Sequence, residues 1–336
     1  MRAADGVPQA RQAPDVEFGL LAWPQATDWP SYRDIVIAAE DAGWDSAWTW
    51  DHLLAIMGSW EQPILEGWTT LAGLASVTTR LRLGLMVGAN GFRNPGLTAK
   101  LATTLDHVSG GRAWLGLGGA WFEREHEAFG IDFGRSVGER LDWLDESVGI
   151  VRRLLDGETV SHDGPHYRLR DAVCRPLPIQ HRLPILVGGS GPRKTLRTVA
   201  RRADGWNTSG SLEQVRERVA ILEEHCADLG RDPGEITRTV SFPIVIRDRD
   251  AAARSRWSEL CAANGIDGGG NVPHLLGSPA RVADAIAPFV ADLGFSTVIC
   301  RMPAPFDHET VDRIAEVRDL LGAAVRPGAV ASAPVA

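Results

Sequence analysis

The feature that most constrains the fold of this chain is a regular alternation of short apolar segments and amphipathic segments between Glu17 and Leu321. The short segments, such as Leu81–Val87, have the length and composition of buried strands, and the longer segments, such as Gly96–Val108, have helical spacing. Alternation of this kind is typical of parallel sheets covered by helices. Eight successive units favour an α/β fold of the (β/α)8 TIM-barrel type, with a doubly wound sheet as the alternative.

The elements follow from the same pattern. The expected strands are Glu17–Ala22, Ser46–Trp50, Leu81–Val87, Arg112–Leu117, Ile185–Val187, Gly205–Asn207, Thr239–Ile246 and Thr297–Cys300. The expected helices are Tyr32–Ala42, Gly67–Val77, Gly96–Val108, Val137–Leu155, a segment from Pro192 through Ala203, Leu212–Leu229, Asp248–Ala263, Ser278–Leu293 and His308–Leu321. Glycines and prolines break the alternation over 156–182, which predicts an inserted hairpin between strands four and five. We therefore expect one domain over 16–322, with disordered tails at 1–15 and 323–336.

Composition limits the function classes. A net charge of −8 without a basic stripe argues against a nucleic-acid partner. No apolar run approaches the roughly 20 residues that span a bilayer, and the start of the chain lacks an apolar signal core. The four cysteines form no CxxC pair, so we expect neither a metal site nor a disulfide framework. A cytoplasmic protein without membrane contact is the expectation.

The second strand ends in Asp51 and His52. Active sites of (β/α)8 barrels lie at the carboxyl ends of the strands, so His52 is a candidate proton donor with Asp51 beside it. The alternative is a loop histidine that Asp51 holds in place. The third and fourth strands end in glycine-rich turns, where Asn90 offers a donor and Gly118 leaves room for a flat ligand. The turn after strand four is not a dinucleotide fingerprint, because Trp121 stands where the third glycine belongs.

The strongest anion-binding signal follows the fifth strand. Backbone N–H groups at a helix N-terminus bind phosphate, and the glycine-rich residues here are Gly188, Gly189, Ser190 and Gly191. Arg193 and Lys194 add positive charge, with Arg197 and Arg201 further along the helix. A plain turn is the alternative. Aromatic side chains at strand ends predict a pocket for a flat ligand, lined by Trp23, Trp50 and Trp121, with Glu123 close to its rim.

Four segments together resemble the bacterial luciferase-like flavin and deazaflavin oxidoreductases, closest to the branch that uses coenzyme F420. They are SAWTWDHL, the LxLGxxV run that continues into GFRNP, AKLATTLDHVSGGRAWLGLGGAWFEREHEAFG, and ILVGGSGPRKTLRTVARRADGWN. The resemblance covers nearly the whole chain. It implies a barrel whose cofactor lies across the carboxyl-terminal rim, and a homodimer.

The resemblance also implies roles for particular residues. A non-proline cis peptide behind the cofactor ring falls at Met86–Val87. Asp51 and His52 match the family's Asp-His pair, Gly188–Gly191 its phosphate loop, and Asn90 a contact to the ring or the ribityl chain. A glutamate that serves as an acid in some members falls in the region of Trp121–Glu123.

The expected function is F420-dependent hydride transfer to or from an organic substrate. The first alternative is an FMN-dependent monooxygenase that uses reduced flavin and oxygen. The second is a non-catalytic relative that binds the cofactor. The substrate and the direction of the reaction do not follow from the sequence.

Overall fold

The computed structural model describes residues 16–266 and 273–324. The tail expected at 1–15 lies outside these ranges. The tail expected from 323 begins two residues too early, because the last helix continues to Ala324, and the remainder of that segment is not described.

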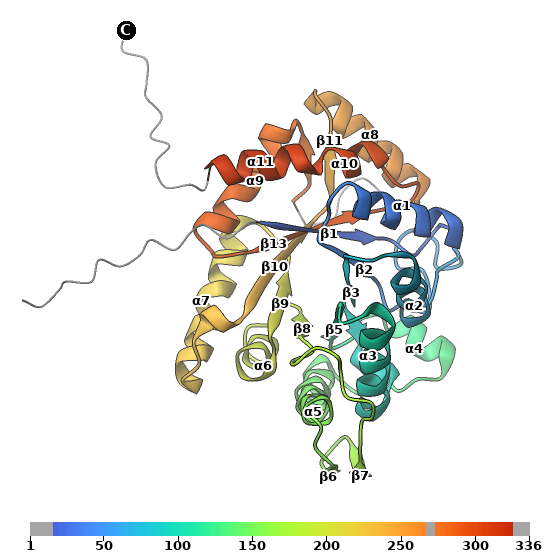
Figure 1. Ribbon diagram of the computed structural model, residues 1–336, viewed down its shortest axis with the longest axis vertical. Coiled ribbons are helices and arrows are strands. Elements are labelled where there is room, and N and C mark those ends of the chain that lie inside the picture. Colours follow the sequence, from blue (N-terminus) through green and yellow to red (C-terminus); the bar gives the residue numbers. More distant parts are fainter. Residues whose placement is uncertain (1–15, 267–272, 325–336) are drawn as a thin grey trace, which may run out of the picture.

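Within the described residues, eight parallel strands form a closed barrel surrounded by helices, which confirms the (β/α)8 fold (Figure 1). The strands are β1 (Glu17–Ala22), β2 (Ser46–Thr49), β3 (Arg82–Leu85), β5 (Ala113–Gly118), β8 (Ile185–Gly188), β9 (Gly205–Thr208), β10 (Thr237–Phe242) and β13 (Thr297–Met302). Pairing of β3 with β5 closes the ring, so the open doubly wound sheet is excluded.

The helices alternate with the strands along the chain. They are α1 (Trp29–Asp41), α2 (Gly67–Val77), α3 (Pro95–Ser109), α4 (Glu123–Phe129), α5 (Val137–Leu155), α6 (Thr195–Arg202), α7 (Leu212–Leu229), α8 (Asp250–Ala263), α9 (Pro279–Ala291), α10 (His308–Asp312) and α11 (Ile314–Ala324), with short 3₁₀ turns η1 (Asn90–Phe92) and η2 (Pro233–Glu235). The sequence pattern missed α4. It also joined α10 and α11 into one helix.

Two expected strands are interrupted. The third strand pairs as β3 up to Leu85 and resumes as β4 (Gly88–Ala89), and the intervening Met86–Val87 peptide bond is cis, as the family resemblance implied. The seventh strand divides at Pro243 into β10 and β11 (Ile244–Ile246). β11 leaves the barrel and pairs with β12 (Leu275–Gly277). Proline has no N–H for a sheet ladder, which fits a strand that changes partners at this point.

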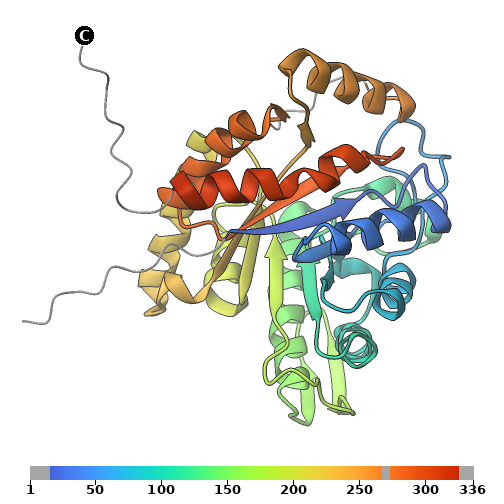
Figure 2. The same ribbon diagram turned by 45° about the horizontal axis from the view of Figure 1, so that its top comes forward.

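The segment between β5 and β8 forms the expected hairpin, from β6 (Val160–Asp163) and β7 (Arg168–Ala172). Figures 1 and 2 show this hairpin beyond the end of α5, on the opposite side of the molecule from α8.

Side chains alternate between two apolar regions. Those on one face of each strand pack against the helices, and those on the other face fill the barrel. We call the barrel filling the inner cluster; it comprises Leu21, Trp23, Trp48, Trp50, Met86, Leu186 and Ile299. Trp48 and Trp50 therefore lie on the same face of their strand, as the alternation predicts.

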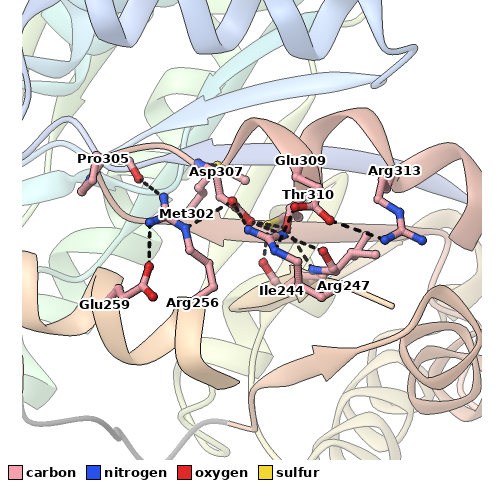
Figure 3. A network of polar contacts seen from close by, with 12 residues as sticks. Ile244, Arg247, Arg256, Glu259, Met302, Pro305, Asp307, Glu309, Thr310 and Arg313 are labelled. Carbon is pink, nitrogen blue, oxygen red and sulfur yellow. Dashed lines mark hydrogen bonds and ion pairs between the residues drawn. The ribbon is translucent and has the colours of Figure 1, made fainter. Parts of the chain in front are cut away.

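An ionic network fastens the loop after β13 to the outer elements (Figure 3). The Asp307 carboxylate accepts hydrogen bonds from Arg247, Arg256 and Thr310. Arg247 follows β11 and Arg256 belongs to α8, so one buried carboxylate connects three segments. Burial acts to raise the pKa of Asp307, but the hydrogen bonds from Arg247 and Thr310 and the nearby guanidinium charges hold that pKa below its ordinary value. The network fixes the carboxyl end of β13.

Candidate active site

His52 follows β2 at the carboxyl-terminal mouth of the barrel and forms a pair with Glu125 of α4. His52 Nδ1 lies 2.8 Å from Glu125 Oε1, and the backbone N–H of Leu53 donates to the other carboxylate oxygen at 2.8 Å. A carboxylate only accepts, so Nδ1 carries the proton in this pair. The Nε2 atom has no hydrogen-bond partner among the described residues. The pair therefore fixes the ring and leaves Nε2 available to a ligand.

Sequence reasoning singled out Glu123, whereas the glutamate that contacts His52 is Glu125. Glu123 is exposed at the start of α4, and Glu125 has only 1% of its surface exposed. Glu123, Glu125 and Glu127 alternate along the chain, and such a spacing taken alone indicates a solvated extended segment. Interpreted as a helix, the same residues place Glu125 about one turn after Phe122, on the side that meets the barrel. The short length of α4 concealed that periodicity.

Aromatic rings surround His52. Its ring centroid lies 6.3 Å from that of Trp50, 5.7 Å from that of Trp121 and 6.3 Å from that of Phe122. Trp23 packs against Trp50 at 4.8 Å. Trp121 is 61% exposed although it borders this group, so the structure places a large apolar surface beside the histidine. Such a surface suits a flat or apolar ligand.

Asp51 points away from this group, into a buried ion pair with Arg93. The guanidinium donates to both carboxylate oxygens, at 2.6 and 2.9 Å, and the N–H of Ala89 donates to Oδ2 at 2.9 Å. Arg93 also reaches Glu66 at 3.1 Å. Burial raises the pKa of Asp51, and the hydrogen bonds from Arg93 act in the opposite direction. The carboxylate thus ties β2 to the turn after β4.

The glycines near the mouth make room for the segment that interrupts the third strand. A Cβ atom on Gly116 would lie 1.8 Å from the carbonyl oxygen of Leu85. A Cβ on Gly118 or Gly188 would lie 2.6 or 2.8 Å from the Val87 side chain. The sequence predicted that Gly118 leaves space for a flat ligand; the structure shows that the space beside it holds Val87.

Gly116→Ala is expected to lower the free energy of unfolding by about 1–3 kcal/mol or more, the usual cost of overpacking. The obstacle is backbone rather than a flexible side chain, so it cannot move aside cheaply. Urea denaturation measures the change. Gly322→Ala is the control, since nothing lies within 4 Å of its Cβ position and alanine favours a helix interior. A Gly116→Ala protein as stable as the control would contradict the packing argument.

The inserted hairpin contributes a residue to the mouth. Asn90 is buried, and its Nδ2 donates to the Tyr167 hydroxyl oxygen at 2.9 Å. Burial raises the pKa of Tyr167 to about 12. The sequence analysis did not identify Tyr167, because no local pattern connects it with a turn that precedes it by 77 residues.

The glycine loop after β8 leads into α6. The N–H of Gly189 donates to the carbonyl oxygen of Asn207 at 3.0 Å. For the N–H groups of Ser190 and Gly191, the described part of the chain supplies no acceptor. Trp206 Nε1 and the His225 ring brace the loop through the carbonyl oxygens of Gly189 and Pro192. The loop is therefore held from behind, with donors available at its tip.

The basic residues after this loop differ in their surroundings. Lys194 contacts Asp142 at 2.7 Å, and Arg201 and Arg202 contact Asp145. Within 16–266 and 273–324, no carboxylate pairs with Arg193 or Arg197. Both border a groove of about 440 Å³ between α5 and α6. Positive charge available to a ligand thus comes from Arg193 and Arg197 more than from Lys194.

In the described ranges, no group of three or more histidine, cysteine, aspartate or glutamate side chains is arranged to hold a metal ion. No helix in the part of the chain that the structure covers is long and apolar enough to cross a membrane.

Comparison with known proteins gives consistent matches. The family model described as luciferase-like monooxygenase matches residues 16–320. The phthiodiolone/phenolphthiodiolone dimycocerosates ketoreductase of Mycobacterium tuberculosis is 31% identical, over 85% of this chain and 84% of the relative. An F420-dependent secondary alcohol dehydrogenase, solved in complex with an F420-acetone adduct, has a TM-score of 0.78 at 18% identity and covers 91% of this chain and 99% of its own.

A second solved structure is a type II Baeyer-Villiger monooxygenase component from Pseudomonas putida in complex with FMN. It has a TM-score of 0.70 at 19% identity, over 91% of this chain and 98% of that one. At these identities the two structural likenesses show the fold. The first of these proteins is described as F420-dependent, and the second was solved with bound FMN.

Proposed function

Because the chain belongs to the luciferase-like monooxygenase family, we propose that it is an F420-dependent oxidoreductase that interconverts a carbonyl compound and an alcohol. The observation that carries the proposal is the His52–Glu125 pair at the barrel mouth, with Nε2 facing no protein partner that the structure describes. The ketoreductase and the secondary alcohol dehydrogenase are both named for chemistry at a ketone or an alcohol, which supports this substrate class.

The residues present fit a phosphorylated, flat cofactor. Donors at the tip of the glycine loop and the N-terminus of α6 suit a phosphate. The Met86–Val87 segment and the Asn90 amide follow β3 and β4, the two parts of the interrupted third strand, where the ring and its side chain would be held. When bound, the deazaflavin supplies a hydride to the carbonyl carbon or accepts one from the alcohol.

His52 handles the proton in this proposal. In the reducing direction Nε2 donates a proton to the carbonyl oxygen, and in the oxidising direction it removes the hydroxyl proton. Glu125 holds Nδ1 and stabilises the positive imidazolium. The rings of Trp50 and Trp121 lie next to the histidine and give it an apolar surrounding on the protein side. We assign Asp51 a positioning role, because its oxygens are engaged by Arg93 and Ala89.

The alternative is an FMN-dependent monooxygenase. It is supported by the similar fold of the Baeyer-Villiger monooxygenase component that was solved with FMN. A non-catalytic relative would also bind cofactor at these residues. The homodimer and the cytoplasmic location stay predictions.

The test is titration of the purified protein with F420 and, separately, with FMN, followed by tryptophan fluorescence. Micromolar binding of F420 without FMN binding is expected. Reduced F420 should then be oxidised in the presence of a ketone substrate. Tight binding of FMN alone would move the protein to the monooxygenase alternative, and binding of neither would refute the cofactor assignment.

The double variant Arg193→Ala/Arg197→Ala is expected to weaken F420 binding about tenfold, with little effect on any residual FMN binding. The acidic tail of F420 extends beyond the phosphate, and exposed charge pairs contribute up to about 1 kcal/mol each. The effect should shrink as salt is raised. Arg249→Ala/Arg254→Ala is the charge-matched control, since Arg249 immediately precedes α8, Arg254 belongs to it, and both are exposed. Equal F420 affinity in the double variant and the control would mean that the acidic tail does not bind in this groove.

A further inference from the structure

Arg301 lies on the inner face of β13, near its carboxyl end. Val298, Cys300 and Met302 of the same strand pack in the apolar core beneath the helices, whereas Ile299 belongs to the inner cluster. Alternation along a strand therefore directs Arg301 into the barrel. Its register partner on β1 is Leu21, another member of the inner cluster.

This arginine has no counter-ion in the described ranges. Neither a salt bridge nor a hydrogen bond from its guanidinium is found there, and Nε is buried without a partner. Burial lowers the pKa of Arg301 to about 10, a further sign of poor charge compensation. A buried guanidinium nitrogen without a partner is costly, so proteins rarely keep one without a use.

The surroundings of Arg301 are those of a ligand site. Trp23, which directly follows β1 and belongs to the inner cluster, packs against Trp50, which in turn neighbours His52. His274 stands close enough that, after burial, the charge of Arg301 contributes to lowering the pKa of His274. The strand register thus places Arg301 on the inner face next to Leu21, two residues before the tryptophan that leads to the proposed proton donor.

We propose that Arg301 binds an acidic group, most simply a carboxylate, on the substrate, so that the protein acts on carbonyl compounds or alcohols that carry an anionic group. This inference rests on the proposed function for the reaction, and the anion site itself does not depend on it. The phosphate loop belongs to β8, from which β13 is separated by β9 and β10. Arg301 is therefore suited to a substrate group rather than to the cofactor phosphate.

The experiment uses the full chain without cofactor and benzoate as the probe, because benzoate combines a carboxylate with an aromatic ring. Benzamide is the uncharged isostere. Tryptophan fluorescence or calorimetry measures both. We expect benzoate to bind and benzamide to bind at least tenfold more weakly. Arg301→Met should weaken benzoate at least tenfold, as the loss of a charged hydrogen bond predicts, and Arg301→Lys should restore part of that loss.

Thermal unfolding of the free protein separates a binding role from a structural one. Arg301→Met should unfold at the same temperature as the wild type or higher, since an uncompensated charge is removed. Arg238→Met is the matched control on neighbouring β10, where the guanidinium is bound by Glu223 and the Leu293 carbonyl oxygen, and it should lower that temperature.

The proposal would be overturned by no benzoate binding by the wild type, by benzoate binding retained in Arg301→Met, or by destabilisation of Arg301→Met as large as that of Arg238→Met. A more than tenfold loss of F420 affinity in Arg301→Met would assign the residue to the cofactor and also overturn it. Failure of F420 binding to the wild type would instead refute the proposed function, while benzoate would still report on Arg301.

Discussion

His52→Ala is expected to lower turnover about 100-fold or more while leaving the affinity for F420 within about threefold. General acid–base catalysis typically contributes 10²- to 10⁴-fold, and His52 Nε2 is the group placed to move the proton. The imidazole takes no part in the phosphate loop or in the Asp51–Arg93 pair, so cofactor binding should survive. Stopped-flow oxidation of reduced F420 with a ketone substrate measures the first quantity, and fluorescence titration measures the second.

Glu125→Gln provides the matched test of the partner. Glutamine can still accept from His52 Nδ1 but carries no charge to stabilise the imidazolium, so an intermediate loss of turnover of about tenfold is expected. His308→Ala, an exposed histidine at the start of α10, is the control. If His52→Ala turned over as fast as the wild type, His52 would have no role in the proton transfer.

Arg93→Met is expected to lower the free energy of unfolding by about 3–5 kcal/mol, the usual cost of leaving one partner of a buried ion pair uncompensated. Asp51 is 2% exposed and would remain buried with a single backbone N–H donor from Ala89. Urea denaturation followed by circular dichroism measures the loss. A fall in F420 affinity should accompany it, because the pair connects β2 with the turn that carries Asn90.

Arg33→Met is the control for this second substitution. Arg33 pairs with Asp34 on the surface, where both side chains are well exposed, and such pairs contribute about 0–1 kcal/mol. A loss below 1 kcal/mol in Arg93→Met would mean that the buried pair adds no more than an exposed one.

The barrel follows from the sequence because its signals are local. Strand and helix periodicities are written in consecutive residues, and helices such as Gly67–Val77 and Leu212–Leu229 have the expected limits. The errors occur where an element changes partner. Nothing in Thr239–Ile246 except Pro243 indicated that the strand divides and that its second part pairs outside the barrel. The expected last strand ended at Cys300, one residue before Arg301, so the sequence analysis did not place Arg301 on a strand.

The candidate site was predicted as a set of positions but not as a set of contacts. Placing Asp51 and His52 at a strand end was sufficient to locate the mouth, and Asn90 and the glycine loop lie at the ends of other strands. Their partners are distant in sequence: Arg93 is 42 residues from Asp51, and Glu125 is 73 residues from His52. Local patterns carry no information about such pairs. Only the structure shows that Asp51 forms a buried ion pair whereas His52 keeps Nε2 available at the mouth.

The hydrogen bond between Asn90 and Tyr167 has a consequence for protein engineering. The segment 156–182 would be chosen as an exchangeable module, since it lies at the surface and its hairpin pairs with itself. Yet its Tyr167 hydroxyl orients an amide at the barrel mouth. A chimaera that receives this hairpin from a relative without a tyrosine at that point would alter the mouth from outside the barrel. Replacing the hairpin to change substrate specificity would therefore also remove the hydroxyl that holds Asn90, and activity could be lost through that one side chain.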